Sequence, residues 1–304
     1  MGGNTRAIDD MSVLYIYLDT SFLSQLTKAA RETHGVSFNT DKWVNLLNLL
    51  RLGIKRGVLL CPTSQFPTEE AMLAEGLLQE FVSLQLELSK GYYFKKYEGI
   101  LVHQVANQAL IYLGRPRDID LGWKAFTRTP PPVRDPLTTA RTKSNMVQYA
   151  ELARVLREKF SRKMSYDEYY EAEKKALLEI TFLNPKSDFP IMLINEAGVR
   201  ETEIQTLLSF LNPKSIDCVA FINIFCSLWA STIIHEHTRK YKEGDLYDVI
   251  SLACAIPYCQ IVTTDSNMKN FMGRLHLDKK YGISVYAPTD RDLDALGKAL
   301  YTAH

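Results

Sequence analysis

Hydrophobic and polar positions alternate along the chain with two different periods. Short apolar runs rich in β-branched residues predict buried strands, at residues 13–18, 58–61, 260–264 and 283–286. Between these runs apolar residues recur three and four positions apart, which predicts helices at 20–31, 41–57, 68–88, 100–113, 218–234 and 290–299. Strands that alternate with helices indicate an α/β fold. We expect a three-layer α/β/α arrangement around a central, mostly parallel sheet.

The middle of the chain has a different character. Residues 127–136 include three consecutive prolines, which cannot continue a helix. From about 137 to 212 the apolar spacing is wholly helical, with segments at 146–160, 165–180 and 196–210. We therefore expect residues 115–212 to form a helical insertion or cap on a domain made of residues 1–114 and 213–304.

Carboxylates stand where several predicted elements begin or end. Asp19 follows the first strand, and Asp265 follows the strand at 260–264. Asp245 and Asp248 open an apolar helix and are three positions apart, so they share a helix face. Open α/β sheets build their sites at the carboxyl ends of the strands. If the two strands are neighbours, the four acids converge and repel one another, and a divalent cation removes that cost. Mg²⁺ or Mn²⁺ suits an all-oxygen site of this kind.

A purely structural role is the alternative for each acid taken alone. The two helix acids just named, and Glu69 and Glu70 near the start of another predicted helix, fall in first turns, where carboxylates complement the helix dipole. Asp19 and Asp265 follow strands, and we do not expect a dipole argument to apply to them. The acids taken together therefore favour metal binding over capping.

Three of these segments carry a family resemblance. Val-Leu-Tyr-Ile-Tyr-Leu-Asp-Thr-Ser at 13–21, Asp-Val-Ile-Ser-Leu-Ala-Cys-Ala at 248–255 and Ile-Val-Thr-Thr-Asp at 261–265 together resemble the PIN-like metal-dependent nucleases. That family has an acid after its first strand, a glutamate in an early helix, an acid that opens a late helix and an acid after a strand-end threonine. The matching residues, in that order, are Asp19, Glu70, Asp248 and Asp265. Glu69 is a close alternative to Glu70, and Asp245 looks like an additional acid beside Asp248. The resemblance covers the first and last thirds of the chain.

The resemblance implies hydrolysis of phosphodiester bonds by one or two Mg²⁺ or Mn²⁺ ions that activate water and neutralise phosphate oxygens. Asp19, Asp248 and Asp265 would bind the metal directly or through water, while Asp245 and Glu70 would hold metal-bound waters or orient the nucleophile. The groups expected to support these ligands are Thr20, Glu69, Thr264, Ser266 and Asn267. Single-stranded RNA is favoured over DNA as the substrate, by family analogy alone.

Two other classes of protein remain open from the residues. A phosphatase of the haloacid-dehalogenase kind also places an aspartate after its first strand, but it has a second one two positions later, where this chain has Ser21. A scaffold without catalytic activity would keep the acids as helix caps and would use the helical insertion to bind a protein partner or inhibitor.

Composition places few limits on these alternatives. Hydrophobic residues make up 46% of the chain and charged residues 23%, values typical of a globular protein. The formal net charge of +1 gives no general basic field for nucleic acid. Local basic residues could still contact a nucleic-acid backbone, although a solvated helix face is the alternative explanation, and the first candidates are Arg128, Arg134, Arg141 and Lys143.

Sequence features also bear on the compartment. The first ten residues are polar and lack the apolar core of a signal peptide, and no apolar stretch is long enough to span a membrane. The five cysteines lie in apolar segments without zinc-type spacing, so we expect buried, reduced thiols. These features predict a cytoplasmic protein that does not enter a membrane.

Overall fold

The computed structural model describes residues 13–31, 40–64, 78–112, 114, 125–129, 136–160, 163–184, 187–197, 199–212, 214–234 and 244–302. Four strands form a single sheet in the order β2-β1-β5-β6, and every neighbouring pair is parallel. The strands are β1 (Leu14–Tyr17), β2 (Leu59–Leu60), β5 (Ile261–Thr263) and β6 (Ser284–Tyr286). The predicted α/β fold with a parallel sheet is thereby confirmed, and β1 and β5 are neighbours.

Side chains alternate across the sheet, as strand geometry requires. Ile16 and Leu18 of the β1 segment belong to one hydrophobic cluster together with Ile261, whereas Tyr17 and Val262 belong to the other. Both faces are therefore buried. This burial explains why the strands read as short, continuous apolar runs.

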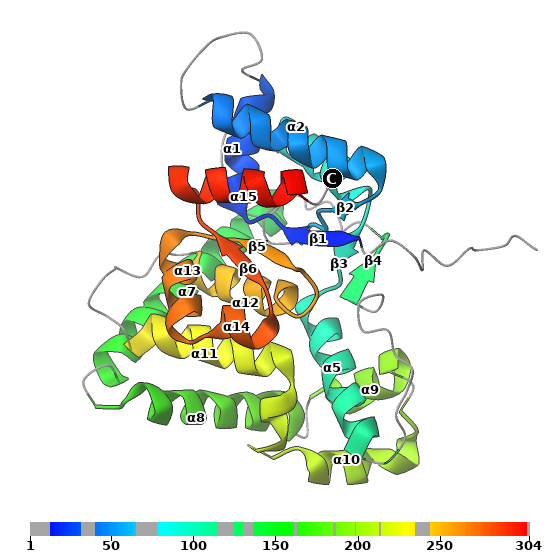
Figure 1. The fold of residues 1–304 in the computed structure, drawn as a ribbon. Coiled ribbons are helices and arrows are strands. Elements are labelled where there is room, and N and C mark those ends of the chain that lie inside the picture. Colours follow the sequence, from blue (N-terminus) through cyan, green and yellow to red (C-terminus); the bar gives the residue numbers. More distant parts are fainter. Residues whose placement is uncertain are drawn as a thin grey trace, which may run out of the picture.

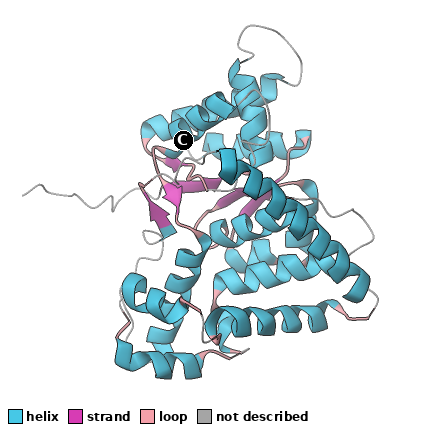
Figure 2. Ribbon diagram, turned by 180° about the vertical axis from the view of Figure 1, so that it is seen from behind, coloured by secondary structure: helices cyan, strands magenta, loops and turns pink. Residues whose placement is uncertain are grey.

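Helices cover both faces of the sheet (Figures 1 and 2). One face packs against α1 (Thr20–Arg31), α2 (Thr40–Arg56), α4 (Leu78–Ser89) and α15 (Asp290–Thr302). The other face packs against α5 (Tyr97–Tyr112), α11 (Ala220–Ile234), α12 (Asp245–Ala255), α13 (Ser266–Arg274) and α14 (Leu277–Tyr281). The two hydrophobic clusters thus form the two interfaces of a three-layer arrangement.

Further helices extend the second face into a thick helical region, seen in the lower half of Figure 1. They are α7 (Pro136–Phe160), α8 (Tyr166–Leu177), the π-helix η1 (Leu178–Phe182), α9 (Phe189–Ala197), α10 (Ile204–Phe210) and the short 3-10 turns η2 (Glu201–Glu203) and η3 (Ser215–Cys218). α7 and α8 pack on α11, and α9 and α10 pack on α5. α11 is buried on most sides because it lies between this region and α12.

The structure corrects two sequence-based expectations in this region. A helix was expected at 196–210, but the chain breaks at Arg200, whose extended backbone (φ −74°, ψ 143°) starts the turn η2 before α10. Cys218 was expected to be buried in the helix that follows. It ends η3 instead and is exposed, whereas the other four cysteines are buried and all five are free.

A small antiparallel pair was not anticipated from the sequence. β3 (Tyr93–Phe94) pairs with β4 (Phe126–Thr127), and Thr63 just after β2 forms a bridge to Tyr93. These strands are only two residues long, so they give no periodic signal. Within the described parts of the chain, no helix combines the length and apolar character needed to cross a membrane.

Candidate acidic site at the carboxyl edge of the sheet

The register of β1 and β5 brings two of the predicted acids to one edge of the sheet. Tyr17 pairs with Val262 in the parallel ladder, so continuing the register by two residues places Asp19 opposite Thr264, next to Asp265. Electrostatics agree with this placement, because the charge of Asp265 is among the causes that raise the pKa of Asp19. Asp19 and Asp265 therefore lie within electrostatic range of each other.

Asp19 is a buried carboxylate, 9% exposed, at the N-terminus of α1. Its Oδ1 accepts hydrogen bonds from the backbone N–H of Phe22 at 3.0 Å and from the Ser21 hydroxyl at 2.9 Å. Burial raises the pKa of Asp19 to about 6, while these hydrogen bonds act in the opposite direction. Near neutral pH this group can therefore both gain and release a proton.

Asp265 also caps a helix. Its Oδ1 accepts from the backbone N–H groups of Asn267 at 2.6 Å and Met268 at 3.0 Å, at the start of α13. Asp19 does the same for α1. The structural alternative for each acid taken alone, a helix cap, is therefore confirmed for both, whereas the expectation that no dipole argument applies to them was wrong. A strand that runs directly into a helix makes its last residue the helix cap, and the two roles coincide in one position.

The helix acids lie on α12, which covers the same end of the sheet. Asp245 and Asp248 are both in its first turn, as predicted, and Asp245 is 1% exposed. The N-cap residue, Gly244, provides no side-chain hydrogen bond to this helix. Burial raises the pKa of the Tyr17 phenol, and the charges of Asp19 and Asp248 raise it further. The charges of Asp248 and Asp19 therefore both act on one buried hydroxyl group.

The sequence did not reveal the buried hydroxyl groups between these acids. Tyr17 is 2% exposed, and Ser251 of α12 hydrogen-bonds its phenol. Ser64, just after β2, is 4% exposed, and its side chain acts on the same phenol. Thr263 Oγ1 accepts from the backbone N–H of Asp19 at 3.0 Å. Only their positions in the sequence could have identified these residues. Tyr17 and Thr263 end strands, Ser64 follows one, and Ser251 lies one helical turn after Asp248.

The remaining predicted site residues have mixed outcomes. Thr264 is 2% exposed and donates its N–H to the Tyr286 carbonyl, Ser266 is exposed, and Thr20 begins α1. Asn267 contributes its backbone N–H to the cap of Asp265. Glu69 and Glu70 lie outside the described residues. In the parts of the chain that the structure covers, no group of three or more His, Cys, Asp or Glu side chains is arranged to hold a metal ion.

Of the four basic residues predicted to contact nucleic acid, Arg128 is the one whose side-chain contacts the structure describes. Arg128 Nη2 donates to the Tyr92 hydroxyl at 2.6 Å, and its guanidinium lies 4.5 Å from the centre of the Tyr92 ring. Arg141 and Lys143 lie on α7, and Arg134 lies outside the described residues. Arg128 is thus held against the β3–β4 pair by an aromatic ring, and the nucleic-acid contacts stay a prediction.

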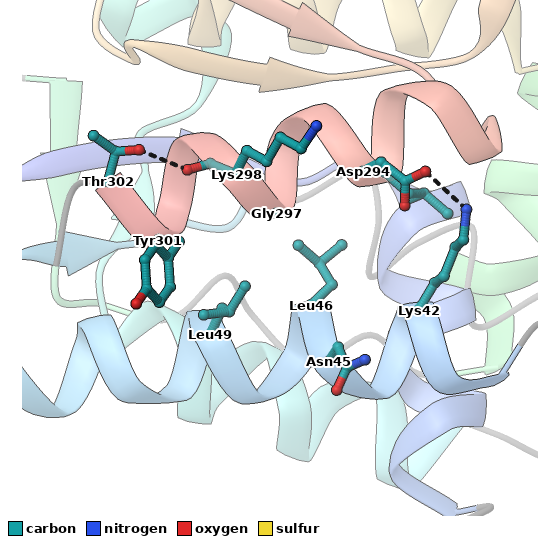
Figure 3. A pocket seen from close by; sticks show the side chains of 10 residues that line it. Lys42, Asn45, Leu46, Leu49, Asp294, Gly297, Lys298, Tyr301 and Thr302 are labelled. Atoms are coloured by element: carbon teal, nitrogen blue, oxygen red, sulfur yellow. Dashed lines mark hydrogen bonds and ion pairs between the residues drawn. The ribbon is translucent and has the colours of Figure 1, made fainter.

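A cavity of about 750 Å³ opens on the opposite side of the sheet, between α2 and α15 (Figure 3). Leu46 and Leu49 rise from α2 towards Gly297, and Tyr301 reaches down from α15. Lys42, at one end, donates to Asp294 at 3.0 Å. This cavity belongs to the face covered by α2 and α15, so it is separated by the sheet from the acids of α12.

Comparison with protein-family models, with curated proteins and with solved structures finds no match to this chain. Fold and site together define an α/β protein with a four-stranded parallel sheet, two of whose neighbouring strands are followed by acids.

Proposed function

We propose that the chain is a divalent-metal-dependent nuclease of the PIN-like kind, acting on single-stranded RNA in preference to DNA. The observation that supports this function is the placement of Asp19 and Asp265 at the ends of two neighbouring parallel strands. α12 adds Asp248 beside the Tyr17 hydroxyl. Two acids that are distant in the sequence thus follow neighbouring strands at one sheet edge, and such edges are where α/β proteins bind their ligands.

The chemistry of the donors suits a hard cation. Carboxylate and hydroxyl oxygens are the ligands that Mg²⁺ and Mn²⁺ prefer. The ligands predicted for this edge are all carboxylates. Asp19, Asp248 and Asp265 would hold the ion directly or through water, and Asp245 and Glu70 would orient its water molecules. The ion would polarise the phosphate and lower the pKa of the attacking water. Asp19 must be ionised to take part, and its pKa of about 6 allows this at neutral pH.

The deciding experiment is cleavage of a labelled single-stranded RNA, with single-stranded DNA of the same sequence as the competing substrate, in Mn²⁺, Mg²⁺ and EDTA. We expect cleavage of RNA that requires the metal. Asp19→Asn and Asp248→Asn should each lose it at least about a hundredfold, because a ligand contributes several kcal/mol to transition-state stabilisation.

Asp290→Asn is the matched control. Asp290 is an acid at the start of a helix, like Asp248, but it lies on α15 beyond the opposite face of the sheet. The nuclease activity of Asp290→Asn should equal that of the wild type. Metal-independent cleavage, or full activity in Asp19→Asn and Asp248→Asn, would exclude the proposed chemistry. Absence of any cleavage together with absence of metal binding would favour the scaffold, in which the acids act only as helix caps.

A further inference from the structure

A cavity of about 360 Å³ lies between the helices that cover the sheet and the outer helical region. Its walls come from α5, α11 and α12 on one side, and from η1, α9 and the end of α8 on the other. Its volume falls in the range of small-molecule sites. We infer that this cavity binds a small organic cation, a compound with an apolar body and an ammonium group.

The apolar part of the site is largely aromatic. The rings of Tyr97 and Phe221 are nearly parallel, with centroids 6.2 Å apart and planes 17° apart. Phe221 and Phe225 continue the row, with centroids 6.0 Å apart and planes 6° apart. Leu246 and Ile250 of α12 line the same cavity. Such walls remove an apolar ligand body from water without requiring it to form hydrogen bonds.

The charge of the lining determines the sign of the ligand. Glu98 and Asp188 line the cavity, whereas none of its lining residues is Lys, Arg or His. Both acids are exposed, and neither makes an ion pair within the described part of the chain. The face of Tyr97 adds a negative quadrupole that attracts cations. An anionic ligand would meet only repulsion here, and a neutral one would gain nothing from either carboxylate.

The Ser187 hydroxyl at the rim is already hydrogen-bonded within the protein, whereas the two carboxylates make no ion pair among the described residues. The Ser187 hydroxyl donates to the Thr181 carbonyl and accepts from the N–H of Phe189. Thr181 itself belongs to the π-helix η1, which continues α8. Isolated π-helical turns are rare and occur frequently at functional sites, because they displace the residues that follow. Here the π-helix contributes Thr181 to the wall of the cavity.

Three probes of the same shape test the inference: 2-phenylethylamine, which is positively charged at pH 7, 2-phenylethanol, which is neutral, and phenylacetate, which is negatively charged. Titration calorimetry on the full chain, in EDTA, should show that the amine binds at least about tenfold more tightly than the alcohol. Phenylacetate should not bind over the same concentration range. EDTA makes the result independent of the proposed metal site.

Charge-neutral variants locate the binding. Glu98→Gln and Asp188→Asn should each weaken amine binding roughly threefold to tenfold and leave the affinity for 2-phenylethanol unchanged. Glu179→Gln is the control, because Glu179 is an exposed acid of the same π-helix that does not line the cavity. Circular dichroism confirms that each variant is folded. Absence of binding by the amine, equal affinities for all three probes, or unchanged amine affinity in both cavity variants would overturn the inference.

Discussion

The backbone N–H of Asp19 donates to the side-chain hydroxyl of Thr263 at 3.0 Å, and the same hydroxyl donates to the Tyr17 carbonyl at 3.2 Å. Thr263 is fully buried at the end of β5. The regular ladder between β1 and β5 stops at Tyr17 and Val262. A side chain of the neighbouring strand therefore continues the pairing beyond the ladder and holds the backbone of the acid in place.

Replacing Thr263 tests this relationship. Thr263→Val keeps the shape of the side chain but leaves the buried N–H of Asp19 without its acceptor. The free energy of unfolding should fall by about 1–3 kcal/mol, the cost of an unsatisfied buried polar group. Thr263→Ser keeps the hydroxyl and should lose less. Urea denaturation followed by circular dichroism measures both, and a valine variant as stable as the wild type would show that this contact does not stabilise the fold.

Asp19 should make the stability of the protein depend on pH. Its pKa of about 6 in the folded state lies above the ordinary value of 3.8, so the folded state binds the proton more tightly. The corresponding stabilisation is complete below about pH 4 and is lost as the pH rises through 6. Asn at this position stays neutral and can still accept the hydrogen bond from Phe22. In EDTA, Asp19→Asn should exceed the wild type at pH 7.5 by up to about 3 kcal/mol.

Denaturant titrations of the two proteins at pH 4.5, 6 and 7.5 measure this difference. It should shrink towards the lowest pH, where the wild-type carboxyl group is also neutral. Asp290→Asn provides the comparison, since Asp290 lies in the first turn of α15. Stability curves that run parallel for Asp19→Asn and the wild type would contradict the assigned proton affinity.

The sequence predicted the sheet because both faces of each strand are buried. For that reason the four apolar runs stand out from the amphipathic helices. Once the strands at 13–18 and 260–264 are recognised, Asp19 and Asp265 are identified as the residues that come after them. The structural role considered for each acid alone is also present, because the backbone N–H of Phe22 donates to Asp19 and those of Asn267 and Met268 donate to Asp265. A strand that runs directly into a helix gives one residue both positions, which is why the dipole argument applies to these acids as well.

Other features lacked a local signal. Ser251, which hydrogen-bonds the Tyr17 phenol, and Thr263, which accepts from the N–H of Asp19, are each more than two hundred residues from their partners in the sequence. The pair β3–β4 has strands of two residues, which no periodicity can indicate. The break at Arg200 accompanies the burial of the neighbouring Val199, which is 2% exposed. These features arise from tertiary packing, so a sequence pattern could not supply them.

Binding of a metal should stabilise the folded protein in a way that depends on pH. A carboxylate must be ionised to ligate a cation, so the ion competes with the proton on Asp19. At millimolar Mn²⁺ the melting temperature of the wild type should rise by several degrees at pH 7.5, as expected for a ligand well above its dissociation constant. The increase should be much smaller at pH 5.

Thermal denaturation at both pH values, with Ca²⁺-free buffer and EDTA as references, measures the shift. Asp19→Asn should show little increase at either pH, while Asp290→Asn should behave like the wild type. An equal Mn²⁺ effect in the wild type and in Asp19→Asn would place the metal elsewhere on the protein.

In the outer helical region, a buried lysine forms ion pairs with two acids. Lys174 of α8 is 1% exposed, and its Nζ lies 2.8 Å from Glu171 Oε1 and 2.7 Å from Asp217 Oδ1. Asp217→Ala removes one partner and leaves a buried ammonium with a single, mostly exposed acid, so the free energy of unfolding should fall by about 1–3 kcal/mol. Lys174→Met keeps the apolar stem and leaves both acids to solvent, so its loss should be smaller. The double variant should be no less stable than Lys174→Met alone, because the uncompensated charge is then gone. Urea denaturation of the three variants gives this cycle, and a larger loss in Lys174→Met than in Asp217→Ala would show that the pair itself, not the cost of an unpaired charge, stabilises the helical region.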